Sequence, residues 1–190
     1  MTRFANSFVR NEDASATIEF LLVFLAFIGT MMFVIETTLY LFFMNSLEKA
    51  AEAGARAAVV SQPVTSSFTA TMPPDQGIRG EDCTDDNCRA VSTFTCIGDG
   101  GAGCNSARLD RLVRLMRHYN GAIAAENVTV VYDEVGIGFA GGPNVPMVTV
   151  RVSGVPFKTG IFGLLLETIP NGLGTLPARA ATMTGEDLAP

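Results

Sequence analysis

Hydrophobic side chains are concentrated in one uninterrupted segment near the N-terminus. Residues 20–44 contain Glu36 as their single charged side chain, and residues 20–35 are apolar or small on every face of a helix. Roughly 20 apolar residues suffice for a helix to cross the hydrocarbon core of a bilayer. A core helix of a soluble domain is the alternative, but such a helix normally keeps a polar face. We therefore expect a membrane-embedded helix.

The helical pattern continues beyond the apolar segment. Residues 45–60 are rich in alanine and have high helix propensity, and Pro63 cannot continue a helix and biases Gln62 away from it. One helix, roughly 70 Å long, is predicted over residues 15–61. Its last turns carry small side chains that either another helix or the protein's own domain would approach closely: Ala50, Ala51, Ala53, Gly54, Ala57 and Ala58.

The rest of the chain predicts a small domain of mixed structure. Residues 106–119 place apolar side chains at helical spacing with four arginines between them, typical of an amphipathic helix packed on a sheet. The arginines either contact anionic lipid or an acidic partner, or form a solvated face, which is the commoner role. Residues 127–132 and 146–152 alternate as strands and predict a hairpin with a long glycine-rich loop. The predicted fold class is α+β.

Two further segments leave alternatives open. Residues 160–169 are apolar enough for a short core helix or for a segment lying on the membrane, and the core is favoured because an exposed apolar patch is a liability. Residues 178–187 predict a final strand or an extended tail.

Four cysteines lie within residues 61–105, a stretch rich in Ser, Thr, Pro, Gly and Asp that otherwise reads as loop. Cys83, Cys88, Cys96 and Cys104 allow three pairings, between which the sequence does not choose. Their spacing lacks the short pairs typical of zinc sites, and His118 is on a separate helix. We expect disulfides, and no metal or cofactor. Because disulfides persist outside the cytosol, we expect a cytoplasmic N-terminus and a periplasmic domain.

Charge and composition exclude several functions. The net charge of −6 argues against nucleic acid, since phosphate binding needs clustered Lys and Arg. Arg3 and Arg10 before the apolar segment balance Lys49 and Arg56 after it, so the positive-inside rule does not set the orientation. With one histidine, no nucleophile motif and no carboxylate pair, we expect no catalytic site and no enzyme.

A lone acid stands at the entrance to the apolar segment. Residues 16–20 read ATIEF, and the preceding residues are polar with cancelling charges. A cleavable signal peptide is one alternative, since residues 51–53 offer an A-x-A cleavage site, but its apolar region is normally shorter. The junction resembles that of type IV prepilins. On that alignment Ala14, where the family usually has Gly, ends the leader, and Ser15 is the mature N-terminus.

The resemblance gives Glu19 a role. It implies that this carboxylate pairs with the free amine of a neighbouring subunit, because an ionised acid in hydrocarbon is costly without a partner. Anchoring the helix at the water interface is the alternative. Glu36 follows 17 residues later (36 − 19), about 26 Å along the helix and on a different face. We therefore expect both acids near the two interfaces rather than deeply buried or paired.

Three stretches together resemble the TadE-like (TadE/TadF) family of minor pseudopilins from the tight-adherence, or Flp, pilus: ATIEF, FVIETTLYLF and EAGARAAVV. The resemblance does not distinguish a TadE from a TadF role. It implies a subunit-docking set of Glu19, Phe20, Glu36, Gly54 and Arg56. The partners it implies are other pilin-like subunits including the major Flp pilin, a prepilin peptidase, the inner-membrane assembly platform and membrane lipid.

The predicted organisation follows. Residues 1–14 are a prepilin-like leader, 15–61 the transmembrane and stalk helix, and 62–190 a periplasmic domain with a Cys-rich loop at 83–104. The function expected is assembly, priming or tip formation of a pilus. The alternative is a membrane-anchored binding or adhesion module that contacts a ligand through the Cys-rich loop, and an anchored hydrolase is more remote.

Overall fold

The computed structural model describes residues 12–66, 68, 80, 93–98, 103–134, 139, 142, 145–157 and 175–185. The described elements are, in chain order, helix α2 (Glu12–Val60), strand β1 (Phe94–Ile97), helix α3 (Ser106–Arg117), the 3-10 turn η2 (Ala125–Asn127), and strands β2 (Val128–Glu134), β3 (Pro146–Val152) and β4 (Arg179–Thr184). The predicted α+β class is confirmed.

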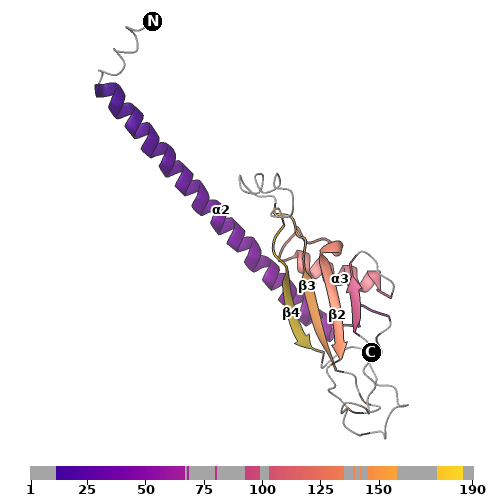
Figure 1. Ribbon diagram of the computed structural model, residues 1–190. Coiled ribbons are helices and arrows are strands. Elements are labelled where there is room, and N and C mark those ends of the chain that lie inside the picture. The colour runs from indigo at the N-terminus through magenta and orange to yellow at the C-terminus, as the bar shows by residue number, and fades with distance from the viewer. Residues whose placement is uncertain are drawn as a thin grey trace.

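Helix α2 has 49 residues and runs without a break through the apolar segment and the alanine-rich turns. At 1.5 Å per residue it is about 74 Å long. Figure 1 shows its N-terminal half projecting away from the sheet, whereas its C-terminal half lies alongside the sheet. The helix ends at Val60, close to the predicted end at residue 61, because Pro63 cannot donate the backbone hydrogen bond that another turn needs.

The four strands form one antiparallel sheet in the order β1-β2-β3-β4. Val130 of β2 pairs with Cys96 of β1 on one side and with Val150 of β3 on the other, and Val150 pairs with Ala181 of β4. Side chains alternate between the two faces of a strand. This row and the parallel rows of valines therefore face the helices, while threonines such as Thr149 and Thr182, joined through their hydroxyls at 2.9 Å, lie on the outer face.

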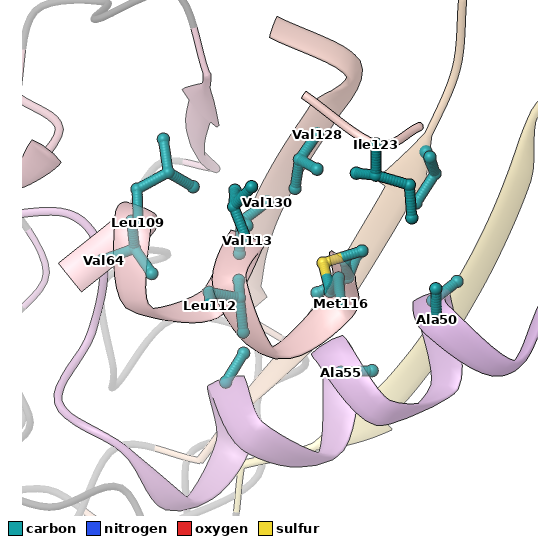
Figure 2. Packing of buried hydrophobic residues seen from close by; sticks show 14 of the residues in the cluster. Ala50, Ala55, Val64, Leu109, Leu112, Val113, Met116, Ile123, Val128 and Val130 are labelled. Carbon is teal, nitrogen blue, oxygen red and sulfur yellow. The ribbon is translucent and has the colours of Figure 1, made fainter. Parts of the chain in front are cut away.

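Both helices cover the same face of the sheet. Helix α2 packs on β3 and β4, and α3 packs beside α2. Figure 2 shows the buried side chains of α3 gathered with those of α2 and β2 in one cluster. Ala50, Ala55 and Ala58 are fully buried, so the small side chains of α2 let the sheet and α3 approach its backbone. Of the two uses open for these alanines, the structure places them in the protein's own domain.

The middle of α2 is attached to the domain by aromatic contacts. The Phe157 ring meets the Tyr40 ring edge to face at 5.5 Å and the Phe43 ring at 5.7 Å between centroids. Further along, the Asn120 amide donates to the Ser46 hydroxyl at 2.8 Å. These contacts join the C-terminal half of α2 to the domain as one unit.

Two expectations change in detail. Strand β1 lies in the stretch expected to be loop, because four residues are too few for a clear alternation and the strand forms by pairing with β2. The segment that was expected to be a strand or a tail is strand β4, which pairs with β3 along its length. Residues 160–169, Cys83 and Cys88 lie outside the described residues.

Candidate functional site

The N-terminal half of α2 is an apolar rod that the described part of the chain leaves exposed. Within Ala16–Val60 the most apolar window has a mean hydropathy of 2.5, and none of it is buried. Phe20 is 69% exposed and Phe33 is 56% exposed. A surface this apolar is unfavourable in water unless lipid or another protein covers it. Among the described residues, one helix is thus long and apolar enough to cross a membrane.

Three threonine hydroxyls of this rod are hydrogen-bonded within the helix. The hydroxyls of Thr30, Thr37 and Thr38 each donate at 2.8 Å to a backbone carbonyl three or four residues earlier. Hydrocarbon offers no hydrogen bonds, so a hydroxyl is tolerated there when it finds a partner in its own helix. The threonines are therefore compatible with a lipid environment.

Glu19 and Phe20 stand exposed near the N-terminal end of α2. Ala14 and Ser15, the expected processing junction, lie within the helical backbone of α2. The helix therefore begins before the expected mature N-terminus at Ser15, and Glu19 follows that residue by four positions (19 − 15), where its carboxylate is exposed.

Glu36 is buried, with 6% of its surface exposed, although Ile35 and Thr37 beside it are exposed. It is the first buried side chain met along the described part of α2 from the N-terminal end. Gly54 follows it by 18 residues (54 − 36), which is about five turns, so both lie on one face. That face packs on the sheet. Glu36 therefore belongs to the protein-covered side of the helix, and the expectation that its side chain is not deeply buried is wrong.

Gly54 and Arg56 have separate surroundings. Gly54 is buried, and a Cβ atom there would lie 2.9 Å from the Met116 sulfur and 3.2 Å from Val150. The close packing of the protein's own domain therefore explains why a glycine stands here, and no contact with a second subunit is needed to explain it. Arg56 is exposed on the other side of the helix. The structure thus does not bring the five expected docking residues onto one surface.

Arg56 borders a groove between α2 and α3, with a cavity of about 580 Å³. The groove is lined by Ala53, Arg56, Ala57, Val60, Leu115, His118 and Tyr119. The spacing of residues 106–119 predicts one apolar face that includes Leu115, but Leu115 is 42% exposed. The buried face is formed by Leu109, Leu112, Val113 and Met116. At about 100° per residue, Leu115 lies about 60° around α3 from Leu112, at the edge of that face. This angle is the signal in the sequence that separates Leu115 from the buried side chains.

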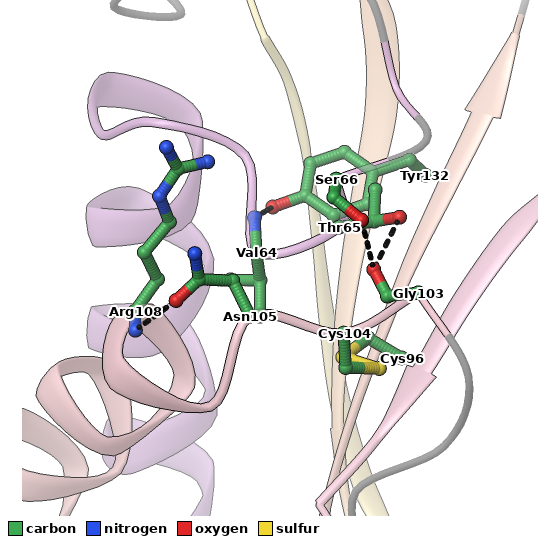
Figure 3. Close-up of a disulfide and its surroundings, with 9 residues drawn as sticks. All are labelled: Val64, Thr65, Ser66, Cys96, Gly103, Cys104, Asn105, Arg108 and Tyr132. Carbon is green, nitrogen blue, oxygen red and sulfur yellow. Dashed lines mark hydrogen bonds between the residues drawn. A yellow bond between two sulfur atoms is a disulfide. The ribbon is translucent and has the colours of Figure 1, made fainter.

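A disulfide and a hydrogen-bonded turn hold the end of α2 to the sheet (Figure 3). Cys96 of β1 is bonded to Cys104, with 5.5 Å between the Cα atoms. The strand-like segment at Cys104 pairs with Thr65, and the Asn105 amide donates to the Val64 carbonyl at 2.7 Å. The Val64 amide donates to the Tyr132 hydroxyl at 3.0 Å. The expectation of a disulfide among the four cysteines is confirmed for this pair.

Burial decides the ionisation of Tyr132. Removal from water raises the pKa of its hydroxyl above the ordinary value of 10.0. The hydrogen bond from Val64 and the positive charge of Arg108 oppose this rise more weakly. Arg108 is itself held by its guanidinium, which donates to the Pro63 carbonyl at 2.7 Å. Val64, Tyr132 and Arg108 thus have a structural role. Among the described residues no three His, Cys, Asp or Glu side chains form a metal site.

Helix and domain together define a class of protein: a long apolar N-terminal helix whose second half is built into a small antiparallel domain, consistent with a single-pass membrane anchor. Residues 14–56 match the model of the TadE-like protein family, as the sequence resemblance predicted. The matched residues all lie within α2. Comparison with curated proteins and with solved structures found no match.

Proposed function

We propose that this protein is a minor pilin-like subunit that acts in assembly, priming or tip formation of a Tad pilus and docks with other pilin-like subunits through the N-terminal half of α2. The observation that carries the proposal is the extent of the family match. The match begins at residue 14, five residues before Glu19, and covers the whole of the exposed apolar rod as well as turns of α2 that pack on the domain. The matched sequence therefore includes the stretch of α2 that the described part of the chain leaves uncovered.

Docking through this rod has a physical basis. Lipid covers apolar side chains as well as another helix does, so packing alone selects a partner weakly. An exposed carboxylate at the helix entrance supplies the selectivity, because it is costly near hydrocarbon until a cation neutralises it. In the proposed mechanism Glu19 pairs with the free amine of a neighbouring subunit, and that pairing fixes the relative height of the two helices.

Orientation and processing complete the proposal. The Cys96–Cys104 disulfide supports a domain outside the cytosol, with the N-terminus in the cytoplasm and α2 in the inner membrane. Cleavage after Ala14 would make Ser15 the mature N-terminus. Intact mass spectrometry of the membrane-extracted protein tests this: a chain beginning at Ser15 agrees with it, whereas one beginning at Met1 or Gly54 contradicts it.

The experiment for the docking role is Glu19→Gln in the native host, with Glu48→Gln as the matched control. Glu48 is exposed on the same helix and beside the folded domain. We expect Glu19→Gln to abolish piliation while the protein stays in the membrane fraction at normal abundance, and Glu48→Gln to leave pili unchanged. Normal pili in both variants would reject the docking role and favour an anchored binding or adhesion module.

A further inference from the structure

The exposed apolar side chains of the domain are gathered at the groove between α2 and α3. Beyond residue 42, the described part of the chain exposes five large apolar side chains: Val60, Ile97, Leu115, Tyr119 and Phe139. Three of the five line the groove. Val60 is 57% exposed, Leu115 42% and Tyr119 49%. Ala53 and Ala57 form the α2 side, so a third backbone can approach closely there.

The surroundings of the groove are cationic, although the chain as a whole carries a charge of −6. None of the seven lining residues is acidic, and Arg56 stands exposed among them. Arg111 is exposed one turn before Leu115 on the same side of α3. Neither arginine forms an ion pair with a described residue, and Glu52, the acid one turn before Arg56, is bonded to Lys49 at 3.1 Å. Asp110 lies about 140° around α3 from Leu115.

Two other arginines of α3 are already used for structure. Arg108 donates to the Pro63 carbonyl, and the Arg117 Nε donates to the Ile123 carbonyl at 2.6 Å. Among the described residues, Arg56, Arg111 and the exposed Arg114, one turn before His118, have no such bond. They are therefore cations at or beside the groove that are open to a carboxylate from outside the chain.

The position of the groove along α2 argues against lipid as the ligand. Arg56 follows Phe42, the last exposed large apolar residue of the rod, by 14 residues (56 − 42). That places Arg56 about 21 Å farther along the helix. The headgroup layer on each side of the hydrocarbon core is only about 5–7 Å thick. With α2 crossing the bilayer, the groove lies beyond the reach of a headgroup.

We propose that the groove between α2 and α3 binds an acidic amphipathic helix of a partner protein, with its apolar side chains on Val60 and Leu115 and a carboxylate on Arg56. A furrow between two helices accepts a third helix through apolar anchors spaced one turn apart, the usual mode of helix-in-groove recognition. The exposed cations beside it provide the charge complementarity that selects and orients such a helix. This second docking surface does not depend on the proposed pairing of Glu19.

Site-specific photo-crosslinking tests the proposal on the full chain in the membrane of its native host. A benzophenone amino acid replaces Leu115, and as a control replaces Ile97, which is 45% exposed on the outer face of the sheet. Adducts are identified by peptide sequencing. We expect a Leu115 adduct to a helical segment that carries an acidic residue, and no adduct to the same segment from position 97.

Charge exchange then decides whether Arg56 recognises that segment. We expect Arg56→Glu to lower the adduct yield about tenfold, and a Lys in place of the partner's acid to restore it in the Arg56→Glu protein. Arg151→Glu, an identical change at an exposed site on the outer face of the sheet, should leave the yield unchanged. An unchanged circular dichroism spectrum of each variant confirms folding. The proposal is overturned by no adduct, by adducts to lipid or to a second copy, or by a yield that ignores Arg56→Glu.

Discussion

Gly54 of α2 lies so close to Met116 of α3 that a Cβ atom at position 54 would stand 2.9 Å from the methionine sulfur. Met116 is fully buried, and Val150 of the sheet closes the same space from another side. Helices α2 and α3 and strand β3 thus meet at a residue without a side chain. This contact connects α2 to the rest of the domain.

Replacing Gly54 with Val should therefore destabilise the domain by about 1–3 kcal/mol, the usual cost of overfilling a packed core. The matched control is Ala53→Val on the neighbouring position, which is half-buried at the groove and has room for the added methyl groups. Denaturant unfolding of the full chain in detergent, followed by circular dichroism, measures both. Equal midpoints for the two variants would contradict the tight junction.

Gly98, at the end of β1, tolerates no side chain for a stronger reason. A Cβ atom there would meet the backbone carbonyl oxygen of Ala125, which unlike a methionine cannot rotate away. Gly98→Ala should separate β1 from η2 and cost about 3 kcal/mol or more. Gly121→Ala is the control, because nothing lies within 4 Å of the added methyl group. Thermal melting of the two variants should differ clearly, and a native-like melt for Gly98→Ala would reject this close approach.

Tyr132→Phe keeps the ring that stacks on Phe68 at 5.5 Å but removes the acceptor of the buried Val64 amide. A buried donor without a partner costs about 1–3 kcal/mol, and we expect a loss of that size in the free energy of unfolding. A loss below the error of the denaturant midpoint would show that the bond contributes nothing.

The same variant should change the dependence of stability on pH. Because the pKa of Tyr132 is raised in the folded state, the unfolded chain releases this proton first as pH rises. The contribution is complete below about pH 10 and is lost as pH rises from there through the folded pKa. Unfolding measured between neutral and alkaline pH should show a shallower alkaline decline in Tyr132→Phe than in the parent protein.

The Cys96–Cys104 bond closes a loop of sequence separation 8. The chain-entropy relation gives about 2.5 kcal/mol for a loop of that size. The double variant Cys96→Ala, Cys104→Ala should lose roughly that much stability. Reducing agent should lower the unfolding midpoint of the parent protein through this bond, an effect that the double variant lacks. Retained stability in the double variant would show that the hydrogen bonds around Val64 and Cys104 suffice to hold the end of α2.

The sequence by itself determined the long helix, its apolar half, the amphipathic helix, the hairpin and the family resemblance. These features are local, because helix and strand periodicity and the position of Pro63 are written in neighbouring residues. The junction around Glu19 is equally local. Its processing and docking stay predictions.

Only the tertiary structure decided which side of α2 the domain covers. Gly54 and Glu36 lie on the covered side and Arg56 on the open side, since the sheet brings Met116 and Val150 against one face of the helix. The same non-local contacts created β1, paired Cys96 with Cys104, and left Leu115 exposed beside Val60. A groove requires two helices at a fixed distance from each other. The residue pattern within one helix does not determine that distance.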